Sequence, residues 1–566
     1  MGSLGQKMVP DHAAVLVIGG GPGGSYTASV LAREGVDTVL LEADVFPRYH
    51  IGESMLASMR FFLRFIDLEE KFDSMGFQKK FGATFKISAG KDAAYTDFAV
   101  SLGKGGHAWN VVRSQADDLM FRYAGEQGAK IFDGTKVDSI EFEPFEPKKF
   151  DEDKNVANPG RAVSANWSRK DGSSGKITFD YIVDASGRAG VISTKYLKNR
   201  TFNEGLRNIA NWTYWEGAKV YGEGSEQQNS PFFEATSDGS GWVWAIPLRN
   251  PERLSVGVVM RQDLFLARKK AAGSPPPTEL YKHCLELAPQ IKNMLENAKI
   301  VSDIKQASDW SYSADTYAGP NFRLVGDAGC FIDPYFSSGV HLALTGGLSA
   351  AMTIQAIRRG EVDEFTSAKW HTTKVATGYT RFLLIVMTVL RQVRMGDKTF
   401  LADEGENGFA AAFGFIQPVI QGAADTDGDI DAKIQQLQGR TVAGVNYALN
   451  KFQGVERAPE EVVVQKVSSI SARLEELDKL STAEMRTLNE IVKKELMAKK
   501  DEKDLEASFT NDTIEGLVPR LEHGNLTLVK KAGAKPVPVA NGNVPEAAMS
   551  PTTMSIMNSG PTAVVA

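Results

Sequence analysis

The hydrophobic pattern near the N-terminus predicts a strand, a turn, a helix and a second strand in succession. Residues 14–19 form an apolar run, residues 25–34 have helical composition, and residues 38–41 are apolar again. Short apolar runs of this kind are typical of fully buried strands, and a helix between two of them is the usual parallel connection. We therefore predict a βαβ unit at the start of the chain.

The pattern changes further along the chain. Between about residues 91 and 310, short β-rich runs are separated by turn sequences such as residues 157–160, which indicates an inserted sheet domain. After Gly339 the chain becomes helical through roughly residue 455. Residues 456–510 are rich in Glu and Lys and predict a charged helix, whereas residues 531–566 contain few bulky side chains and predict a disordered tail.

Composition excludes several classes of protein. The 42% hydrophobic and 24% charged fractions are typical of a globular enzyme, and the net charge of −6 argues against a nucleic-acid partner. Cys284 and Cys330 are the only cysteines and lie far apart, so we expect neither a disulfide framework nor a metal site. The apolar run 382–390 is shorter than the roughly 20 residues of a membrane span. Without a secretion signal, we expect a cytoplasmic protein with no membrane anchor.

A glycine-rich turn follows the first predicted strand. It has the pattern G-x-G-x-x-G and opens directly into the helix. Glycines let the backbone approach a pyrophosphate, whose charge then meets free N–H groups and the positive end of the helix dipole. Glu42, at the end of the second strand, is placed to accept hydrogen bonds from an adenosine ribose. The predicted dinucleotide-binding residues of the turn are Gly19, Gly20, Gly21, Gly23 and Gly24.

Three further segments favour FAD over NAD. Residues 184–187 and residues 326–328 each follow a short apolar strand. They resemble the second and third fingerprints of the glutathione-reductase-like FAD enzymes, in which the later aspartate, here Asp327, holds the ribityl chain. Residues 48–54 resemble the mobile loop over the flavin in the same enzymes, with Glu53 as an expected contact. The order and spacing of these segments predict FAD as the cofactor.

These features predict an α/β fold in four regions. The first is a discontinuous FAD-binding, Rossmann-like domain of the glutathione-reductase type, formed by residues 1–90 with 295–350. Residues 91–294 form an inserted mixed β-sheet substrate domain that includes the second flavin fingerprint. Residues 351–455 form a helical region that covers the substrate, and residues 456–566 form the charged helix and tail. A chain of 566 residues can bury a deep site between such regions.

A tryptophan-containing motif, Trp242-Val243-Trp244-Ala245-Ile246-Pro247, matches the pattern W-x-W-x-I-P. With two other motifs, it makes residues 12–455 resemble the flavin-dependent halogenases, most closely those of fungal polyketide pathways that act on phenols. The resemblance implies that the two indoles lie near the flavin and keep an organic substrate away from it. From this motif alone, two tryptophans that alternate on one strand are better explained as core aromatics.

A second motif lies at residues 331–339, which fit the halogenase pattern F-x-x-P-x-x-S-x-G. Ser338, Gly339 and Val340 fall at the start of an apolar helix, where unpaired N–H groups form an anion site. The resemblance implies that Ser338 and Gly339 bind chloride and that Val340 presents its amide to the flavin. We also expect Ser338 to cap this helix. Tryptophan halogenases carry a glutamate where this chain has Phe336, which fits the phenol branch of the family.

The third motif lies within residues 76–85 and matches K-x-G-A-x-F, which places the catalytic lysine at Lys80 and not at Lys79. Most lysines are solvated surface groups, so this assignment rests on the resemblance. In the family the lysine transfers the halogen from hypohalous acid to the substrate, either as a hydrogen-bond donor or as a chloramine. Burial that lowers the pKa of the amine would favour the chloramine.

The resemblance also implies the reaction and its partners. FADH2 would come from a separate NAD(P)H-dependent flavin reductase, because no second dinucleotide fingerprint is present. O2 would convert it to a flavin hydroperoxide, from which chloride or bromide forms the hypohalous acid. The substrate would be an electron-rich phenolic ring of polyketide type in secondary metabolism. Arg113 resembles an arginine that contacts the flavin, although an ion pair with Asp117 explains it equally well.

Two other functions remain open. An FAD-dependent aromatic hydroxylase of the same fold would insert oxygen without halide, and the W-x-W-x-I-P segment argues against it. A non-catalytic flavoprotein is a different class, against which Lys80 and the chloride turn argue. The base that activates the phenol is not identified by the sequence. His107 and His341 are candidates by location only, and each is also explained as a structural histidine.

Overall fold

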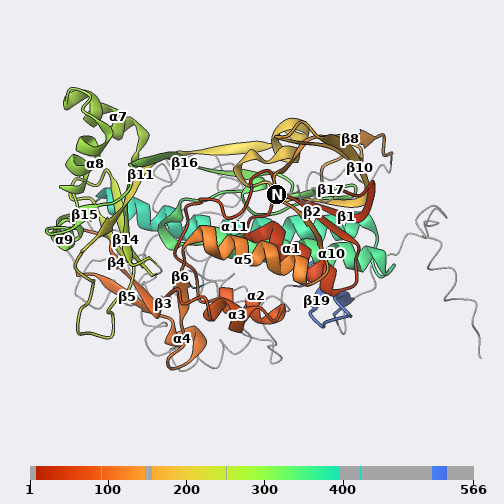
Figure 1. Ribbon diagram of the computed structural model, residues 1–566, viewed down its shortest axis with the longest axis horizontal. Helices are drawn as coiled ribbons and strands as arrows, with labels where there is room; N and C mark the ends of the chain where they lie inside the picture. Colours follow the sequence, from red (N-terminus) through yellow and green to blue (C-terminus); the bar gives the residue numbers. More distant parts are fainter. Residues whose placement is uncertain are drawn as a thin grey trace, which may run out of the picture.

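The structure is a computed structural model. It describes residues 8–90, 92–146, 156–249, 251–395 and 513–531, together with residues 150 and 421. Two eight-stranded sheets organise these residues, and they lie toward opposite ends of the molecule (Figure 1).

The first sheet contains the predicted βαβ unit and has the strand order β17-β18-β10-β1-β2-β7. β1, β2, β7, β10 and β18 pair in parallel, and β8 and β9 extend the sheet through antiparallel pairs with each other and with β10. Parallel strands covered on both faces need apolar side chains at nearly every position, which explains the continuous runs in the sequence. The strands are β1 His12–Ile18, β2 Thr38–Leu41, β7 Lys130–Phe132, β8 Thr135–Glu143, β9 Arg161–Arg169, β10 Ser174–Asp184, β17 Ala318–Gly319 and β18 Phe322–Leu324.

Three helices cover one face of this sheet. Val15 and Val17 of β1 belong to the same apolar cluster as buried residues of α1, α5 and α10, whereas Leu16 and Ile18 belong to the cluster on the other face. α1 and α10 cross closely, since a Cβ on Gly347 of α10 would lie 3.0 Å from the carbonyl oxygen of Gly23. The long helix α11 packs against α10. The helices are α1 Pro22–Arg33, α5 Arg113–Glu126, α10 Gly339–Arg358 and α11 Glu364–Met395.

The second sheet has the order β15-β11-β14-β13-β12-β4-β5, with β16 on the other part of β11. Short helices α7, α8 and α9 lie at its outer side, at the end of the molecule away from β1 (Figure 1). The strands are β4 Gly82–Lys86, β5 Ala94–Asp97, β11 Arg200–Glu216, β12 Phe232–Ala235, β13 Gly241–Leu248, β14 Arg253–Arg261, β15 Lys299–Ile300 and β16 Lys305–Ala314. The helices are α7 Gln262–Ala271, α8 Pro277–Leu285 and α9 Pro289–Met294.

Two small sheets complete the described fold. β3 (Gln78–Lys80) pairs with β6 (Ala108–Asn110), near α2 (Met59–Phe65), α3 (Glu69–Asp73) and α4 (Ala99–Leu102). The hairpin of β19 (Leu517–Arg520) and β20 (Thr527–Lys530) lies within the part of the chain where the sequence predicts only a charged helix and a tail. Glu34, just after α1, accepts hydrogen bonds from the backbone N–H groups of Gly524 and Leu526 and so holds the hairpin.

The structure confirms the predicted α/β fold with a second, mixed sheet, but several strands belong to a different sheet from the one that the predicted region boundaries imply. β15 and β16 fall within residues 295–350 but belong to the second sheet. β7 to β10 fall within residues 91–294 but belong to the first sheet, whereas β4 falls before residue 91 and belongs to the second. The pairings of β10 with β1 and of β4 with β12 join residues more than a hundred positions apart, which no local pattern encodes. Residues 456–510, predicted as a charged helix, and nearly all of the predicted tail lie outside the described residues.

The apolar run 382–390 lies within α11, as a buried helix. α10 and α11 are long and apolar enough to cross a membrane by length and composition alone. In α10, 83% of the most apolar window is buried inside the protein, so its composition is explained by the core.

Candidate functional site

Three strand ends meet at one edge of the first sheet. Ile18 at the end of β1 pairs with Asp184 at the end of β10, which pairs in turn with Leu324 at the end of β18. Because parallel strands end at the same edge, the turns that follow them lie side by side, which is where open α/β sheets bind ligands. The three predicted flavin fingerprints, which begin at Gly19, Asp184 and Gly326, therefore converge in space.

The glycine turn forms a cradle that side chains would fill. Gly19 has a φ of +95°, and a Cβ on Gly24 would lie only 1.9 Å from the carbonyl oxygen of Gly19. A Cβ on Gly23 would lie 2.9 Å from the side chain of Val325, which directly precedes the third fingerprint. Gly21 precedes the first residue of α1, so the N–H groups of the first helical turn open onto this cradle. This arrangement fits the pyrophosphate of FAD.

Glu42 lies at the end of β2, next to the same turn. One carboxylate oxygen accepts a hydrogen bond from Gly20 N at 2.5 Å, and the other accepts one from Asp44 N at 2.8 Å. Each carboxylate oxygen can accept a second hydrogen bond, so capacity for a ribose hydroxyl remains. The predicted ribose contact of Glu42 stays a prediction, as does that of Asp327 with the ribityl chain.

Arg113, the first residue of α5, is engaged by the protein itself. It forms a bidentate ion pair with Asp117, at 2.8 and 2.9 Å, and donates hydrogen bonds to the carbonyl oxygens of Ile51 and Gly52 at 2.7 and 3.0 Å. The ion pair that the sequence allows as an alternative is therefore present. Arg113 fixes the segment that the sequence predicts over the flavin, and a direct flavin contact stays a prediction.

Glu53, in the same segment, has its side chain directed into the second sheet. Its Oε1 accepts a hydrogen bond from the Tyr214 hydroxyl of β11 at 2.6 Å, and its backbone oxygen accepts one from Val111 N. Burial raises the pKa of Glu53, although the Tyr214 hydrogen bond opposes this effect. Trp212 Nε1 donates a hydrogen bond to the hydroxyl of Tyr49, which also hydrogen-bonds with the Tyr214 hydroxyl. The segment is thus tied to the second sheet, and no local pattern in the sequence pairs Glu53 with Tyr214.

The tryptophan motif lies on β13. Trp242 and Trp244 are buried, on the same face of the strand, with ring centroids 5.9 Å apart. Trp242 packs edge-on against Tyr335 at 5.0 Å, so the motif contacts the predicted chloride turn. Trp244 Nε1 donates a hydrogen bond to Ser255 Oγ. Both indoles therefore serve as core aromatics, and their predicted role beside the flavin stays a prediction.

The end of the motif reaches the lysine-bearing sheet. Ile246 is 7% exposed, and the carbonyl oxygen of Pro247 accepts a hydrogen bond from Asn110 Nδ2 of β6 at 3.1 Å. β6 pairs with β3, which carries the predicted catalytic lysine. The W-x-W-x-I-P segment thus contacts the predicted chloride turn through Trp242 and the strand next to Lys80 through Pro247.

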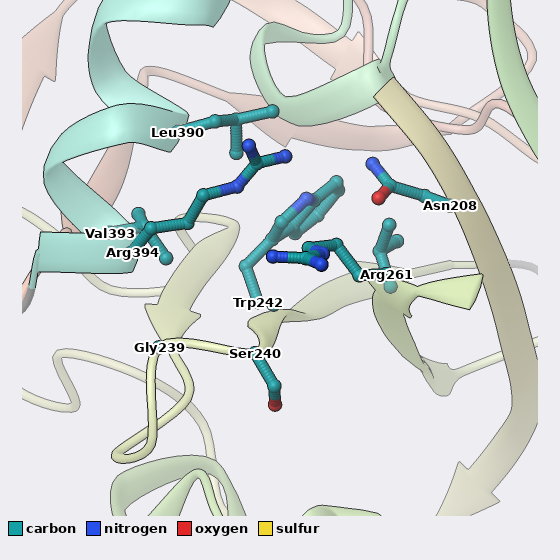
Figure 2. Close-up of a pocket in the computed structure, with 10 residues that line it drawn as sticks. Asn208, Gly239, Ser240, Trp242, Arg261, Leu390, Val393 and Arg394 are labelled. Atoms are coloured by element: carbon teal, nitrogen blue, oxygen red, sulfur yellow. The ribbon is translucent and has the colours of Figure 1, made fainter. Parts of the chain in front are cut away.

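A small pocket opens beside Trp242 (Figure 2). The guanidinium groups of Arg261 and Arg394 lie near the indole, and the pocket is completed by Asn208, Gly239, Ser240, Gly241, Val259, Leu390 and Val393. Asn208 donates a hydrogen bond to Asp333 at 2.7 Å, and burial raises the pKa of Asp333 to about 6. The pocket therefore borders the turn that contains the second motif.

The predicted chloride turn precedes α10. Residues 334–336 form a 3-10 turn, Ser337 has a φ of +57°, and α10 begins at Gly339. Phe336, which stands in place of a glutamate, packs against Phe85 with ring centroids 5.2 Å apart. Only open space would surround a Cβ on Gly339. The free N–H groups of the first turn of α10 fit a small anion such as chloride.

Ser338 does not cap α10 in the way that the sequence predicts. It occupies the N-cap position, but its side chain makes no capping hydrogen bond, so the predicted cap is wrong. The residue is fully buried, and its Oγ has no hydrogen-bond partner within the described residues. Its φ of −82° and ψ of −13° are helical and not extended, which points the hydroxyl away from the helix N–H groups. A bound ion is one explanation of a buried hydroxyl without a partner, and the chloride-binding role of Ser338 stays a prediction.

Lys80 ends β3 and is 2% exposed, whereas its neighbour Lys79 is exposed. The amine Nζ donates hydrogen bonds to Ser54 Oγ at 2.8 Å and to the carbonyl oxygen of Met55 at 2.9 Å. It lies 4.9 Å from the centroid of the Phe98 ring. Burial lowers the pKa of Lys80 to about 7, so the free amine is populated at neutral pH.

The two candidate bases differ in their surroundings. His107 bonds to Asp73 and lies beside Arg60, in a network of ion pairs. His341, in the first turn of α10, is buried, and its Nδ1 hydrogen-bonds with Ser58 Oγ at 2.9 Å. His341 is therefore the one that lies beside the predicted chloride turn, although neither is shown to be the base.

Comparisons with known proteins agree with this arrangement. The chain matches the family model described as tryptophan halogenase over residues 14–127 and 106–386. It is 64% identical over 528 residues to the sulochrin halogenase gedL of Aspergillus terreus, covering 92% of this chain and 94% of the relative. It is 60% identical over 543 residues to the flavin-dependent halogenase ptaM of Pestalotiopsis fici, covering 95% and 98%.

A solved structure shows the same fold. The myxobacterial chondrochloren halogenase CndH, a variant of the FAD-dependent halogenases, has a TM-score of 0.60 and 27% sequence identity to this chain. The match covers 69% of this chain and 87% of CndH.

Proposed function

This chain belongs to the tryptophan halogenase family and is an FAD-dependent halogenase, and we propose that it halogenates an electron-rich phenolic ring of polyketide type at Lys80. The observation that carries the role of Lys80 is a buried amine without an ion-pair partner among the described residues. Burial lowers its pKa to about 7, which makes the amine a nucleophile at neutral pH.

The cofactor supplies the oxidising chemistry: bound as FADH2, FAD reduces O2 so that a halide becomes hypohalous acid. In the proposed reaction the Lys80 amine attacks the halogen of this acid, and hydroxide leaves and takes the amine proton to form water. A ring carbon of the phenol then takes the halogen from nitrogen, which keeps the electron pair of the N–halogen bond and takes up a proton. The ring loses its proton to a base, so that overall one proton passes from the ring to nitrogen. The amine is regenerated, so the residue acts catalytically.

The other residues position the reactants in this proposal. The N–H groups at Ser338 and Gly339 hold the halide, and Val340 contributes the amide that faces the flavin edge. Gly19 to Gly24, Glu42 and Asp327 bind FAD. Trp242 and Trp244 close the space between the flavin and the organic substrate, which suppresses direct oxygenation.

The substrate class is proposed from two observations. One relative at 64% identity is named for sulochrin. Phe336 and its packing against Phe85 leave no carboxylate at the position where tryptophan halogenases carry one. A phenolate needs less activation than an indole, so an apolar residue there suits a phenol.

The enzyme also needs a supply of reduced flavin. Flavin-dependent halogenases generally take FADH2 from a separate reductase, and we propose an NAD(P)H-dependent flavin reductase as the partner and the cytoplasm as the location. The two cysteines, Cys284 and Cys330, are buried and unpaired, as suits a reducing compartment.

The test is mass spectrometry of products from purified enzyme with FAD, a flavin reductase, NADH, O2 and a panel of phenolic polyketides. Chloride and bromide should each appear in the product with their isotope patterns. Lys80→Met should lose the product, whereas Lys79→Ala, which removes the adjacent exposed amine, should retain it. A halide-independent gain of one oxygen would instead establish the aromatic hydroxylase.

A further inference from the structure

The hydroxyl of Ser54 contacts the Lys80 amine, although Ser54 belongs to none of the three halogenase motifs. Ser54 lies in an extended segment that bridges to Asn110 of β6, while Lys80 pairs with Ala108 on the other side of the same strand. Ala108 is small and fully buried. The lysine side chain reaches Ser54 Oγ at 2.8 Å and the Met55 carbonyl oxygen at 2.9 Å.

Lys80 Nζ has two oxygen acceptors, as many as the neutral amine has N–H donors. A free amine has two N–H donors and one lone pair, whereas an ammonium has three N–H donors. Two oxygen acceptors hold Nζ within the described residues, and the remaining neighbour is the face of the Phe98 ring. In the free amine these two oxygens accept from both N–H groups and leave the lone pair directed away from them, whereas in the ammonium the third N–H has the Phe98 ring face as its partner among the described residues.

The ionisable groups of the adjacent elements are directed elsewhere. Glu53, beside Ser54, accepts a hydrogen bond from Tyr214, and Lys79 on β3 is exposed. Asp97, beside Phe98, accepts one from Ala99 N, and His107, which precedes β6, bonds to Asp73. None of them forms an ion pair with Lys80 within the part of the chain that the structure describes. The orientation of Nζ therefore depends on Ser54 and Met55.

We propose that Ser54 is a positioning residue for halogen transfer, because its hydroxyl and the Met55 carbonyl hold both N–H groups of the neutral Lys80 and aim the lone pair at the incoming halogen. The Met55 carbonyl alone would leave Nζ free to rotate about its bond to Cε. This inference rests on the proposed role of Lys80, and it adds the residue that orients the amine.

The test compares Ser54→Ala with Ser54→Thr, which keeps the hydroxyl. The midpoint of Lys80 titration is read from the 13Cε shift of lysine-labelled protein, assigned by its absence in Lys80→Arg. Ser54→Ala should lower this midpoint by about one pH unit, because a hydrogen bond to a charged group is stronger than one to its neutral form. Ser54→Thr should leave the midpoint in place.

Turnover should fall in Ser54→Ala, although a lower midpoint leaves more of the Lys80 amine neutral. Measured at a pH above both midpoints, where Lys80 is neutral in each enzyme, halogenation by Ser54→Ala should be at least about tenfold slower, because a misdirected lone pair loses the reacting geometry. Ser54→Thr should stay within about twofold of the wild type. A purely electrostatic role would instead give equal rates at this pH, and more free amine at neutral pH would then raise turnover.

Besides equal rates above both midpoints, two results would overturn the proposal: an unchanged midpoint in Ser54→Ala, or an equal loss of turnover in Ser54→Ala and Ser54→Thr. Ser349→Ala removes another buried serine hydroxyl, the one hydrogen-bonded to His371, and should leave the Lys80 midpoint unchanged. If the wild-type enzyme halogenated no phenol, the proposed function would fail, but the midpoints of the two Ser54 variants would still decide whether this hydroxyl holds the Lys80 amine.

Discussion

At the scale of single residues, Lys80 carries an energetic cost that its proposed chemistry requires. A surface lysine keeps its amine charged and solvated, whereas Lys80 is 2% exposed and has no carboxylate partner among the described residues. The pKa falls from 10.5 to about 7 because the buried ammonium is poorly solvated. The same burial that populates the nucleophilic amine therefore destabilises the folded protein at neutral pH.

The pH dependence of stability tests this cost. Because the folded pKa is lowered, the unfolded chain binds more protons between pH 7 and pH 10.5, and stability rises with pH in that window. Relative to Lys80→Met, the wild type should gain about 3 kcal/mol of unfolding free energy between about pH 7.5 and 10. Urea unfolding of both proteins over this pH range measures the difference between their unfolding free energies. The contributions of all other titrating groups are the same in the two proteins and cancel in that difference. Parallel curves would show that the Lys80 pKa is not lowered.

Ser338 leads to a second prediction at this scale. Its Oγ is buried without a hydrogen-bond partner among the described residues, so Ser338→Ala loses no hydrogen bond. Its unfolding free energy should be unchanged or rise by up to about 1 kcal/mol. If the hydroxyl donates to the halide, the KM for chloride should rise about tenfold while the KM for the phenol stays in place. Steady-state kinetics over a range of chloride concentrations checks this; a lower stability with an unchanged chloride KM would contradict it.

At the scale of elements, the packing of β13 against β14 decides where Trp244 lies. Trp244 pairs across the strands with Gly257, and a Cβ on Gly257 would lie 2.1 Å from Cζ2 of the indole. The glycine therefore makes the space that the ring occupies. No motif that includes Trp244 also includes this glycine, because the two meet only through strand pairing.

Gly257→Ala should move the indole. Overpacking of this kind costs about 1–3 kcal/mol, so the melting temperature should fall. If the tryptophans separate flavin from substrate, the variant should release more hydrogen peroxide for each halogenated product. Gly378→Ala is the control, since its Cβ would lie at an ordinary 3.6 Å from Leu342. Unchanged coupling despite a lower melting temperature would mean that Trp244 serves the core alone.

At the scale of the whole molecule, His371 joins three elements near the edge of the first sheet where β18 ends. It lies on α11, hydrogen-bonds with Ser349 of α10 at 2.9 Å, and contacts the carbonyl oxygen of Leu324 at the end of β18 at 3.0 Å. Burial lowers its pKa to about 3, so the imidazole is neutral in the folded protein. Protonation would leave a buried charge at the junction of these elements.

Protonation of His371 at acid pH should therefore lower the unfolding free energy of the protein. Its folded pKa lies below the ordinary 6.5, so its contribution to stability is complete above pH 6.5 and is lost as the pH falls toward 3. Between about pH 7.5 and 5, the wild type should lose about 2 kcal/mol more unfolding free energy than His371→Gln. Urea unfolding at the two pH values measures this, and equal losses would contradict it.

Much of the fold and the site follows from the sequence alone, because several of the functional motifs consist of contiguous residues. Three of the motifs are short contiguous segments, each recognisable from its own residues: the turn at Gly19, the Trp242 motif and the turn at Ser338. Lys80 belongs to the same class, since the K-x-G-A-x-F frame that marks it is also contiguous. The family, its cofactor and the halide chemistry could therefore be predicted.

Tertiary structure alone decides how these segments act together. The pairing of β10 with both β1 and β18 brings the three fingerprints to one edge, and the pairing of β3 with β6 buries Lys80 beside Ser54. The conformation of Ser338 leaves its hydroxyl free, although the residue type predicts a cap. Hydrogen bonds, burial and strand register join residues far apart in the chain, and a pattern along the chain contains no information on those distances.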